Sequence, residues 1–386
     1  MASNLLVDSG VRGQRASSLL GLVAAALLVV HSSYTGQEFM PSYLFVWFFL
    51  LGLSLGAMAL VFVHNLTGGA WGELIRPILE ALVRMLPYCA LLAIPLLLRL
   101  PDLYTWMRSS DIAVPDVETV QSWYLNATFF WIRWILYFSV WIFLSFQLQK
   151  RSPHRTPGAD PPAASRFQAA SAVGLVLFLL TTTFASIDWT MSLTPQWHST
   201  EFGLLAAIAQ SLSALAFSVV SVAWFKSEER ESLCPAFHDL GNLLLALVLF
   251  WSYLAFMQFL IIWIEDLPND ISWYLPRAQK GWRSLTLFLA CVHFAIPFLV
   301  LLSRRVKRMP QALGLLAALQ LFACLTDTFW LVVPPFRPQG LQPQWNDLLV
   351  LLAVGGVWFG LLIRIARTPA APTNRTQTQG PVVRHA

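Results

Sequence analysis

Titratable side chains that interrupt long apolar segments are the first candidates for chemistry in this sequence. Asp188, His293 and Asp327 each lie within, or at the end of, such a segment. An ionisable group placed in hydrocarbon is costly, so it faces the interior of a helix bundle and tends to serve a function. Buried carboxyl groups of this kind have a charged partner or a raised pKa. The sequence leaves open whether Asp327 has a functional polar role or only a structural one.

His293 stands near the middle of its apolar segment, four residues before Pro297. An imidazole at that depth suits a proton relay or a contact with a quinone. The alternative is that its ring hydrogen-bonds a neighbouring helix and has only a structural role. The sequence leaves both interpretations open.

A short and almost wholly non-basic segment follows Asp188 and contains His198 and Glu201. These three groups predict a proton relay at the outer surface of a membrane. The alternative is that Asp188, together with Ser199 or Thr200, caps the ends of helices.

Gln258 and Glu265 are seven residues apart and fall on nearly the same face of a helix. The pair predicts a polar path that enters the membrane from outside. The alternative is that Glu265 belongs to a solvated loop that forms a docking surface.

The elements that position these residues follow from composition. Hydrophobic residues make up 57% of the 386 and charged residues only 12%, with a mean hydropathy of +0.61. A soluble domain has roughly a quarter of its residues charged, so lipid must cover most of this surface. A helix needs about 20 apolar residues to cross a bilayer. The sequence predicts ten such spans, near 17–35, 42–63, 79–100, 125–147, 170–189, 202–225, 240–264, 284–303, 311–333 and 347–366. The third is the most interrupted, since it contains Pro87 and Pro95.

Lysine and arginine positions predict the orientation of these spans, because basic residues concentrate in cytoplasmic loops. With the N-terminus inside, 18 of the 25 basic residues lie on the cytoplasmic side: Arg12, Arg15, Arg76, Arg84, Lys150, Arg151, Arg155, Arg166, Lys226, Arg230, Arg304, Arg305, Lys307, Arg308, Arg364, Arg367, Arg375 and Arg384. The outer side holds six: Arg99, Arg108, Arg277, Lys280, Arg283 and Arg337. Arg133 falls within the fourth span. We therefore predict a multi-pass protein with both termini in the cytoplasm.

The chain is expected to form one integral membrane domain over residues 1–367. A segment near 150–168, rich in Pro, Ser and Ala, predicts a flexible cytoplasmic linker between two groups of helices. The polar tail over 368–386 is expected to be disordered and cytoplasmic.

No bound redox centre or metal site is expected from the cysteine and histidine patterns. The four cysteines form no CxxC pair, and no CxxCH motif for covalent haem is present. A haem between two histidines needs ligands at the same depth on facing helices, and His293 has no such partner in the sequence. Electrons would therefore move in partner subunits, and no catalytic residue is assigned.

Three blocks of the sequence resemble a known family. The first runs from Tyr124 to Arg133 and on to Trp141, the second from Asp188 to Thr200, and the third from Asp239 to Arg308. In the order and spacing of rare residues they resemble the smaller integral membrane subunit (ActF type, also called quinone-binding subunit 2) of alternative complex III. That complex is a bacterial quinol:cytochrome c oxidoreductase, and the subunit belongs to the NrfD/PsrC-like group. The resemblance covers roughly residues 70–310.

The resemblance implies an all-α fold of two four-helix bundles plus two flanking helices, in the bacterial inner membrane. It implies partners: a related larger NrfD-like membrane subunit, an iron–sulfur subunit and c-type cytochrome subunits, which carry the iron–sulfur clusters and haems. This chain would anchor those redox subunits and contribute a proton path or a quinone contact, without being catalytic alone. The chain departs from the family pattern mostly on the outer side, at Gln121, His198, Glu201, Asn242 and Asp266.

Two other classes of function are compatible with the sequence. A secondary transporter shows broken helices at the membrane midplane and internal repeats, but the prolines at 87, 95 and 297 do not occupy matching positions in two halves. A purely structural or assembly protein would tolerate neutralisation of Asp188 or Asp327 without loss of activity.

Overall fold

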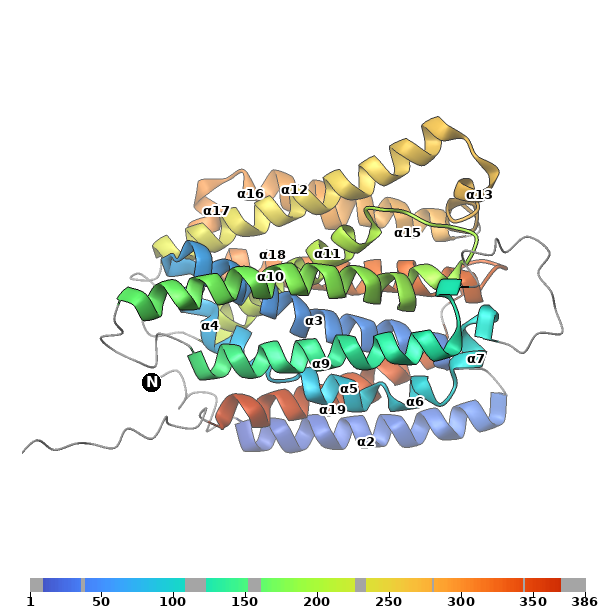
Figure 1. Cartoon of the computed structure of the whole chain (residues 1–386), viewed down its shortest axis with the longest axis horizontal. Helices are drawn as coiled ribbons and strands as arrows, with labels where there is room; N and C mark the ends of the chain where they lie inside the picture. Colours follow the sequence, from blue (N-terminus) through green and yellow to red (C-terminus); the bar gives the residue numbers. More distant parts are fainter. Residues whose placement is uncertain are drawn as a thin grey trace, which may run out of the picture.

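Long helices that run nearly side by side make up the molecule (Figure 1). The computed structural model describes residues 10–35, 39–107, 123–151, 161–225, 234–279, 281–342 and 344–368, and these residues form helices and no strands. Nine helical segments in the described part of the chain are long and apolar enough to cross a membrane, and the apolar part of α2, Ala16–His31, is a shorter tenth. The chain is therefore a polytopic all-α membrane protein, as predicted.

The first bundle is built around α3, whose residues are almost all buried. Large aliphatic and aromatic side chains of α3 fill its centre, and the neighbouring helices present mixed buried and exposed faces. Its four members are α3 (Met40–Thr67), the interrupted helix α4–α5–α6 (Ala70–Val83, Leu86–Leu92 and Ile94–Leu97), α9 (Ala127–Arg151) and α10 (Pro161–Trp189).

The second bundle packs on the first through α11 and α3. The two helices approach closely at Gly56, where a Cβ atom would lie 2.0 Å from the backbone oxygen of Gln210. Small residues permit such approaches between helices in a membrane. The second bundle consists of α11 (Phe202–Phe225), α12 (Cys234–Glu265), the interrupted helix α15–η4–α16 (Trp282–Leu289, Ala290–Ala295 and Ile296–Leu301) and α18 (Pro310–Val332).

Two flanking helices, α2 (Gly10–Thr35) and α19 (Trp345–Arg367), pack against each other. The contact is tight because Gly356 faces Gly21, where a Cβ atom would lie 2.9 Å from the Gly21 Cα. The beginning of α2 and the end of α19 lie at the same end of the molecule, and the side chain of Arg367 donates a hydrogen bond to that of Gln14 over 3.4 Å. We call this the terminal end and the other the far end.

Short helical turns connect the long helices. At the far end they are α7 (Leu100–Leu103), η1 (Thr105–Met107), η3 (Met191–Leu193), α13 (Pro268–Ile271), α14 (Tyr274–Arg277) and η5 (Pro334–Phe336). The turn α17 (Arg304–Arg308) lies at the terminal end and carries the basic run. The described helix ends that flank the predicted cytoplasmic loops thus lie together at one end.

The third predicted span, 79–100, is wrong at its beginning, because the helix starts at Ala70. The charged residues there are accommodated within the helix, since Arg76 binds Glu80 with an Nε–Oε1 distance of 3.0 Å and also donates to Asn65. The two breaks in this helix precede Pro87 and Pro95, each of which lacks the N–H needed to continue a helix.

The linker expected over 150–168 is partly helical. Helix α9 continues to Arg151 and α10 begins at Pro161, so only 152–160 lies between them, outside the described residues. Proline fits the first turn of a helix because its missing N–H would have no partner there. The Pro- and Ala-rich residues from Pro161 onward, which suggested a linker, therefore form the first turns of α10. Gln121 and the tail after Thr368 are also outside the described residues.

Candidate functional site

A buried ion pair joins α9 and α10 in the first bundle. The guanidinium group of Arg133 donates to both carboxylate oxygens of Asp188, with distances of 2.7 Å from Nε and 2.9 Å from Nη2. The Tyr137 hydroxyl donates a third hydrogen bond over 2.8 Å. Asp188 is fully buried. Each charge is therefore matched by a partner of fixed geometry.

Aromatic rings complete this ion pair. The guanidinium carbon of Arg133 lies 3.9 Å from the ring centre of Tyr124 and 4.4 Å from that of Phe129. Arg133 also donates through Nη1 to the Tyr124 backbone oxygen over 3.0 Å. Both carboxylate oxygens of Asp188 already accept hydrogen bonds, so the group is poorly placed to bind a substrate or to transfer a proton. The ion pair therefore indicates a structural link between α9 and α10.

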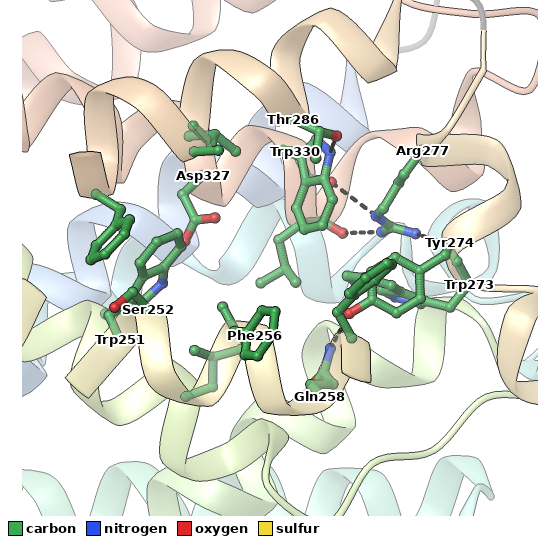
Figure 2. Close-up of a pocket in the computed structure, with 18 of the residues that line it drawn as sticks. Trp251, Ser252, Phe256, Gln258, Trp273, Tyr274, Arg277, Thr286, Asp327 and Trp330 are labelled. Atoms are coloured by element: carbon green, nitrogen blue, oxygen red, sulfur yellow. Dashed lines mark hydrogen bonds between the residues drawn. The ribbon is translucent and has the colours of Figure 1, made fainter. Parts of the chain in front are cut away.

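The second bundle encloses a cavity of about 760 Å³. Residues of α11, α12, α14, α15, η4 and α18 line it, and most of them are apolar or aromatic (Figure 2). Tyr253 and Phe256 of α12 and Leu287 of α15 line the cavity and are more than half exposed. Because all three belong to membrane-spanning helices, the rim between α12 and α15 faces lipid. A ligand could therefore enter sideways from the bilayer.

Asp327 of α18 contributes a carboxyl group to the wall of this cavity. The indole of Trp251 lies beside that carboxyl group (Figure 2). Among the described residues no lysine or arginine forms an ion pair with Asp327, in contrast to Asp188. An intramembrane carboxyl group that faces a cavity can exchange a proton with a ligand or with water.

Arg277 of α14 closes the far end of the same cavity. Its guanidinium group donates to three backbone oxygens, those of Trp273, Trp330 and Leu331, over 2.7, 3.3 and 2.8 Å. The guanidinium carbon lies 3.6 Å from the ring centre of Trp273, which in turn stacks on Trp197. The cation is thus rigidly held but neutralised by no carboxylate among the described residues.

A single π-helical turn, η4, interrupts the eighth span beside the cavity and carries His293. The His293 ring is fully buried and lies 3.8 Å, centre to centre, from the indole of Trp251. Its Nε2 is 3.6 Å from the Sγ of Cys324, and its Nδ1 has no hydrogen-bond partner among the described residues. Turns of this type occur often at functional sites.

Further buried polar groups form a row behind the cavity wall. Gln320, Cys324 and Asp327 are spaced by four and three residues, so they share one face of α18. Both amide atoms of Gln320 and the Oε1 of Gln210 on α11 lack a partner among the described residues, although both side chains are buried. Leaving such an atom without a hydrogen bond costs about 1–3 kcal/mol. Internal water molecules commonly satisfy atoms of this kind.

The row extends about 10 Å along α18, from the cavity at Asp327 to the helix middle at Gln320. The group includes a carboxyl group and an imidazole, both of which can exchange protons, and amide atoms without hydrogen-bond partners among the described residues. The second bundle therefore holds buried polar groups without charged partners, whereas the first bundle holds a fully paired arginine and aspartate.

No protein-family model matches this chain, and no curated protein matches it.

The structure does not bring Asp188 together with His198 and Glu201. The Asp188 carboxylate binds Arg133 and Tyr137, whereas His198 is exposed in the loop before α11. The helix-capping alternative is not observed for Asp188 either, because its carboxylate binds other side chains. Glu201 lies near the second bundle, and partial burial raises the pKa of its carboxyl group.

Gln258 and Glu265 are also separated. Gln258 is buried in the cavity wall, where its side chain accepts from Ser199 and donates to the Tyr274 hydroxyl, each over 3.3 Å. Glu265 is exposed at the last residue of α12. Only Gln258 and Asp327 of the predicted candidates line the cavity, and His293 lies directly behind it.

Arg277, Gln320 and Gln210 did not appear among the predicted site residues. The two glutamines could have been found as amides near the middle of predicted spans. Arg277 gives no such signal, because it follows a loop and becomes buried only when α14 folds over the cavity.

Proposed function

We propose that this chain is an integral membrane subunit of a quinol-oxidising respiratory complex of the quinol:cytochrome c oxidoreductase type. Its terminal end would face the cytoplasm of a bacterium, which agrees with the excess of basic residues in the sequence there. The partners would be a related larger membrane subunit, an iron–sulfur subunit and c-type cytochrome subunits. Those partners would carry the haems and iron–sulfur clusters.

The observation that carries the proposal is Asp327 on the wall of a lipid-facing cavity, with a row of buried polar groups behind it. Quinol oxidation releases protons, and a membrane complex needs a route for them. Asp327, His293 and Gln320 offer the part of such a route that lies between the cavity and the middle of α18. The three sequence blocks and the two-bundle architecture are consistent with the same assignment.

The first test is affinity purification of the tagged chain in mild detergent, with mass spectrometry and a haem absorbance spectrum of the purified material. Multihaem cytochrome c and iron–sulfur subunits in the same complex are the expected result. A colourless protein that purifies alone would contradict the proposal.

The second test is the variant Asp327→Asn in the purified complex. We expect proton release coupled to quinol oxidation to fall at least tenfold, because the carboxamide cannot exchange a proton. Asp239→Asn is the control, since that carboxylate is half-exposed at the terminal end. Unchanged proton release and turnover in Asp327→Asn and His293→Gln would favour a scaffold role without a proton path.

A secondary transporter is the second candidate, and the interruption of α15–η4–α16 beside the cavity is the observation that favours it. The purification separates the two candidates. Absence of redox partners, combined with substrate uptake by vesicles that contain only this chain, would favour the transporter.

A further inference from the structure

The ends of the membrane-spanning helices indicate that the far end of the cavity would lie at the depth of lipid head groups. It is bordered by α14 and the first turn of α15, where the membrane spans end. Trp273, Tyr274 and Trp330 line this part of the cavity, and such aromatic residues are typical of the membrane–water interface. A ligand that reaches this end can therefore have a polar head.

Two arginines line this end of the cavity, Arg277 and Arg283. Arg277 is only 2% exposed, and three backbone oxygens accept three of its five N–H groups. The remaining two N–H groups have no acceptor within the described ranges. Burial lowers the pKa of this guanidinium group, so a nearby anion would stabilise its charge.

Arg283 is exposed at the first turn of α15, and it forms no ion pair or hydrogen bond with the described residues. Two positive charges without carboxylate partners thus converge on one cavity. Guanidinium groups bind phosphate through paired N–H donors, which gives both affinity and orientation.

The remainder of the cavity suits a hydrocarbon chain. Its walls are mostly apolar, and the rim formed by Tyr253, Phe256 and Leu287 faces lipid. The backbone oxygen of Leu331 on α18 accepts a hydrogen bond from Arg277. Asp327 precedes Leu331 by four residues on the same helix, so it lies about 6 Å farther from the far end than this contact does. The Asp327 carboxyl group offers no attraction to an anion, whereas the two arginines do, so an anionic head is favoured at the arginine end. The ligand must therefore be amphipathic, with its negative charge toward the far end.

We propose that this cavity is a binding site for one anionic phospholipid, with the phosphate at Arg277 and Arg283 and an acyl chain between α12 and α15. The site would be filled from the bilayer leaflet at the far end. It does not depend on the proposed respiratory function, because a scaffold or a transporter with the same cavity would bind the same lipid.

Native mass spectrometry of the full chain in detergent, titrated with phosphatidylglycerol, tests the proposal. The wild type is expected to bind one phosphatidylglycerol about tenfold more tightly than phosphatidylcholine. Arg283→Gln should weaken phosphatidylglycerol binding about tenfold, as expected for loss of a charge-assisted hydrogen bond. This variant should fold, because Arg283 is exposed and holds no other described residue.

Two further variants sharpen the test. Arg99→Gln removes an exposed arginine at the same end but outside the cavity, and it should leave lipid binding unchanged. Ala206→Leu places a larger side chain on the cavity wall at a buried position of α11, and it should weaken binding of the lipid.

Three results would overturn the proposal. Equal lipid binding by the wild type and Arg283→Gln would show that the arginines do not recognise the head group. Displacement of the lipid by inorganic phosphate alone would indicate a site for a free anion. Displacement by a short-chain benzoquinone, with no preference for anionic lipid, would indicate a quinone site instead.

Discussion

Each of the two bundles holds an arginine and an aspartate toward the far end of the molecule, and the two bundles treat these charges differently. In the first, Arg133 and Asp188 bind each other in a bidentate pair that a tyrosine hydroxyl completes. In the second, Arg277 and Asp327 lie apart on the wall of one cavity, and neither has an oppositely charged partner among the described residues.

This difference indicates that the charges of the first bundle have a structural role, whereas those of the second bundle are available for function. The first pair satisfies its own hydrogen bonds, so it holds two helices together but offers nothing to a ligand. The second pair has no charged partner among the described residues and lines a cavity that lipid-soluble molecules can reach. Intramembrane charges therefore need to be judged by their partners as well as by their depth.

The largest expected effect comes from breaking the pair in the first bundle. Asp188→Asn leaves Arg133 buried without a counter-charge, and loss of one partner of a buried ion pair destabilises a protein by about 3–5 kcal/mol. Thermal unfolding of the detergent-solubilised protein measures this loss. The double variant Arg133→Met, Asp188→Leu should recover most of the stability. If the double variant is no more stable than Asp188→Asn, the pair has a role beyond a clamp.

The two bundles are in close contact where Gly56 of α3 meets α11. A Cβ atom at Gly56 would lie 2.0 Å from the backbone of Gln210, so Gly56→Ala must push α3 and α11 apart. Overpacking of this kind costs about 1–3 kcal/mol. Gly355→Ala is the matched control, since nothing lies within 4 Å of its Cβ position, and it should be neutral or slightly stabilising. Equal melting temperatures for the two variants would contradict the close packing.

Asp327→Asn should affect stability far less than Asp188→Asn. The amide has nearly the same volume, and the substitution breaks no ion pair among the described residues. We expect the melting temperature to stay the same or to rise, while proton release falls as described above. A loss of stability comparable to that of Asp188→Asn would show that the Asp327 carboxylate has a charged partner. The two bundles would then use their aspartates in the same way.

The smallest effect is expected at Glu201, next to the second bundle. Desolvation raises the pKa of this carboxyl group above its usual 4.5, so the unfolded state releases the proton first as pH rises. Glu201 therefore lowers stability as pH rises from 4.5 through the folded-state pKa. Glu201→Gln should remove this loss, with a gain at pH 7 of no more than about 0.5 kcal/mol and none at pH 4. Melting temperatures at both pH values provide the check.

Hydropathy predicted the helices well, because each span must be apolar over its whole length. The span at 202–225 coincides with α11, and the others differ mainly at their ends. The errors occurred where polar residues were satisfied inside the helix, as Arg76 is by Glu80. A hydropathy profile does not register such partners.

The site was harder to predict, because its residues come from distant parts of the chain. Arg133 and Asp188 are 55 residues apart. One signal was present, since both lie near the far ends of consecutive, antiparallel spans and so share a depth. The cavity itself gave no signal, because its walls combine residues of α11, α12, α14, α15, η4 and α18 that are distant in the sequence.

The packing of α2 on α19 has a consequence for how the molecule is made. The two helices are joined through Gly21 and Gly356, yet 310 residue positions separate Thr35 from Trp345. During synthesis α2 must stay in the bilayer with its glycine surface open until α19 has been inserted. A chain that ends before Trp345 leaves this glycine surface to lipid, which cannot pack against it as closely as α19 does.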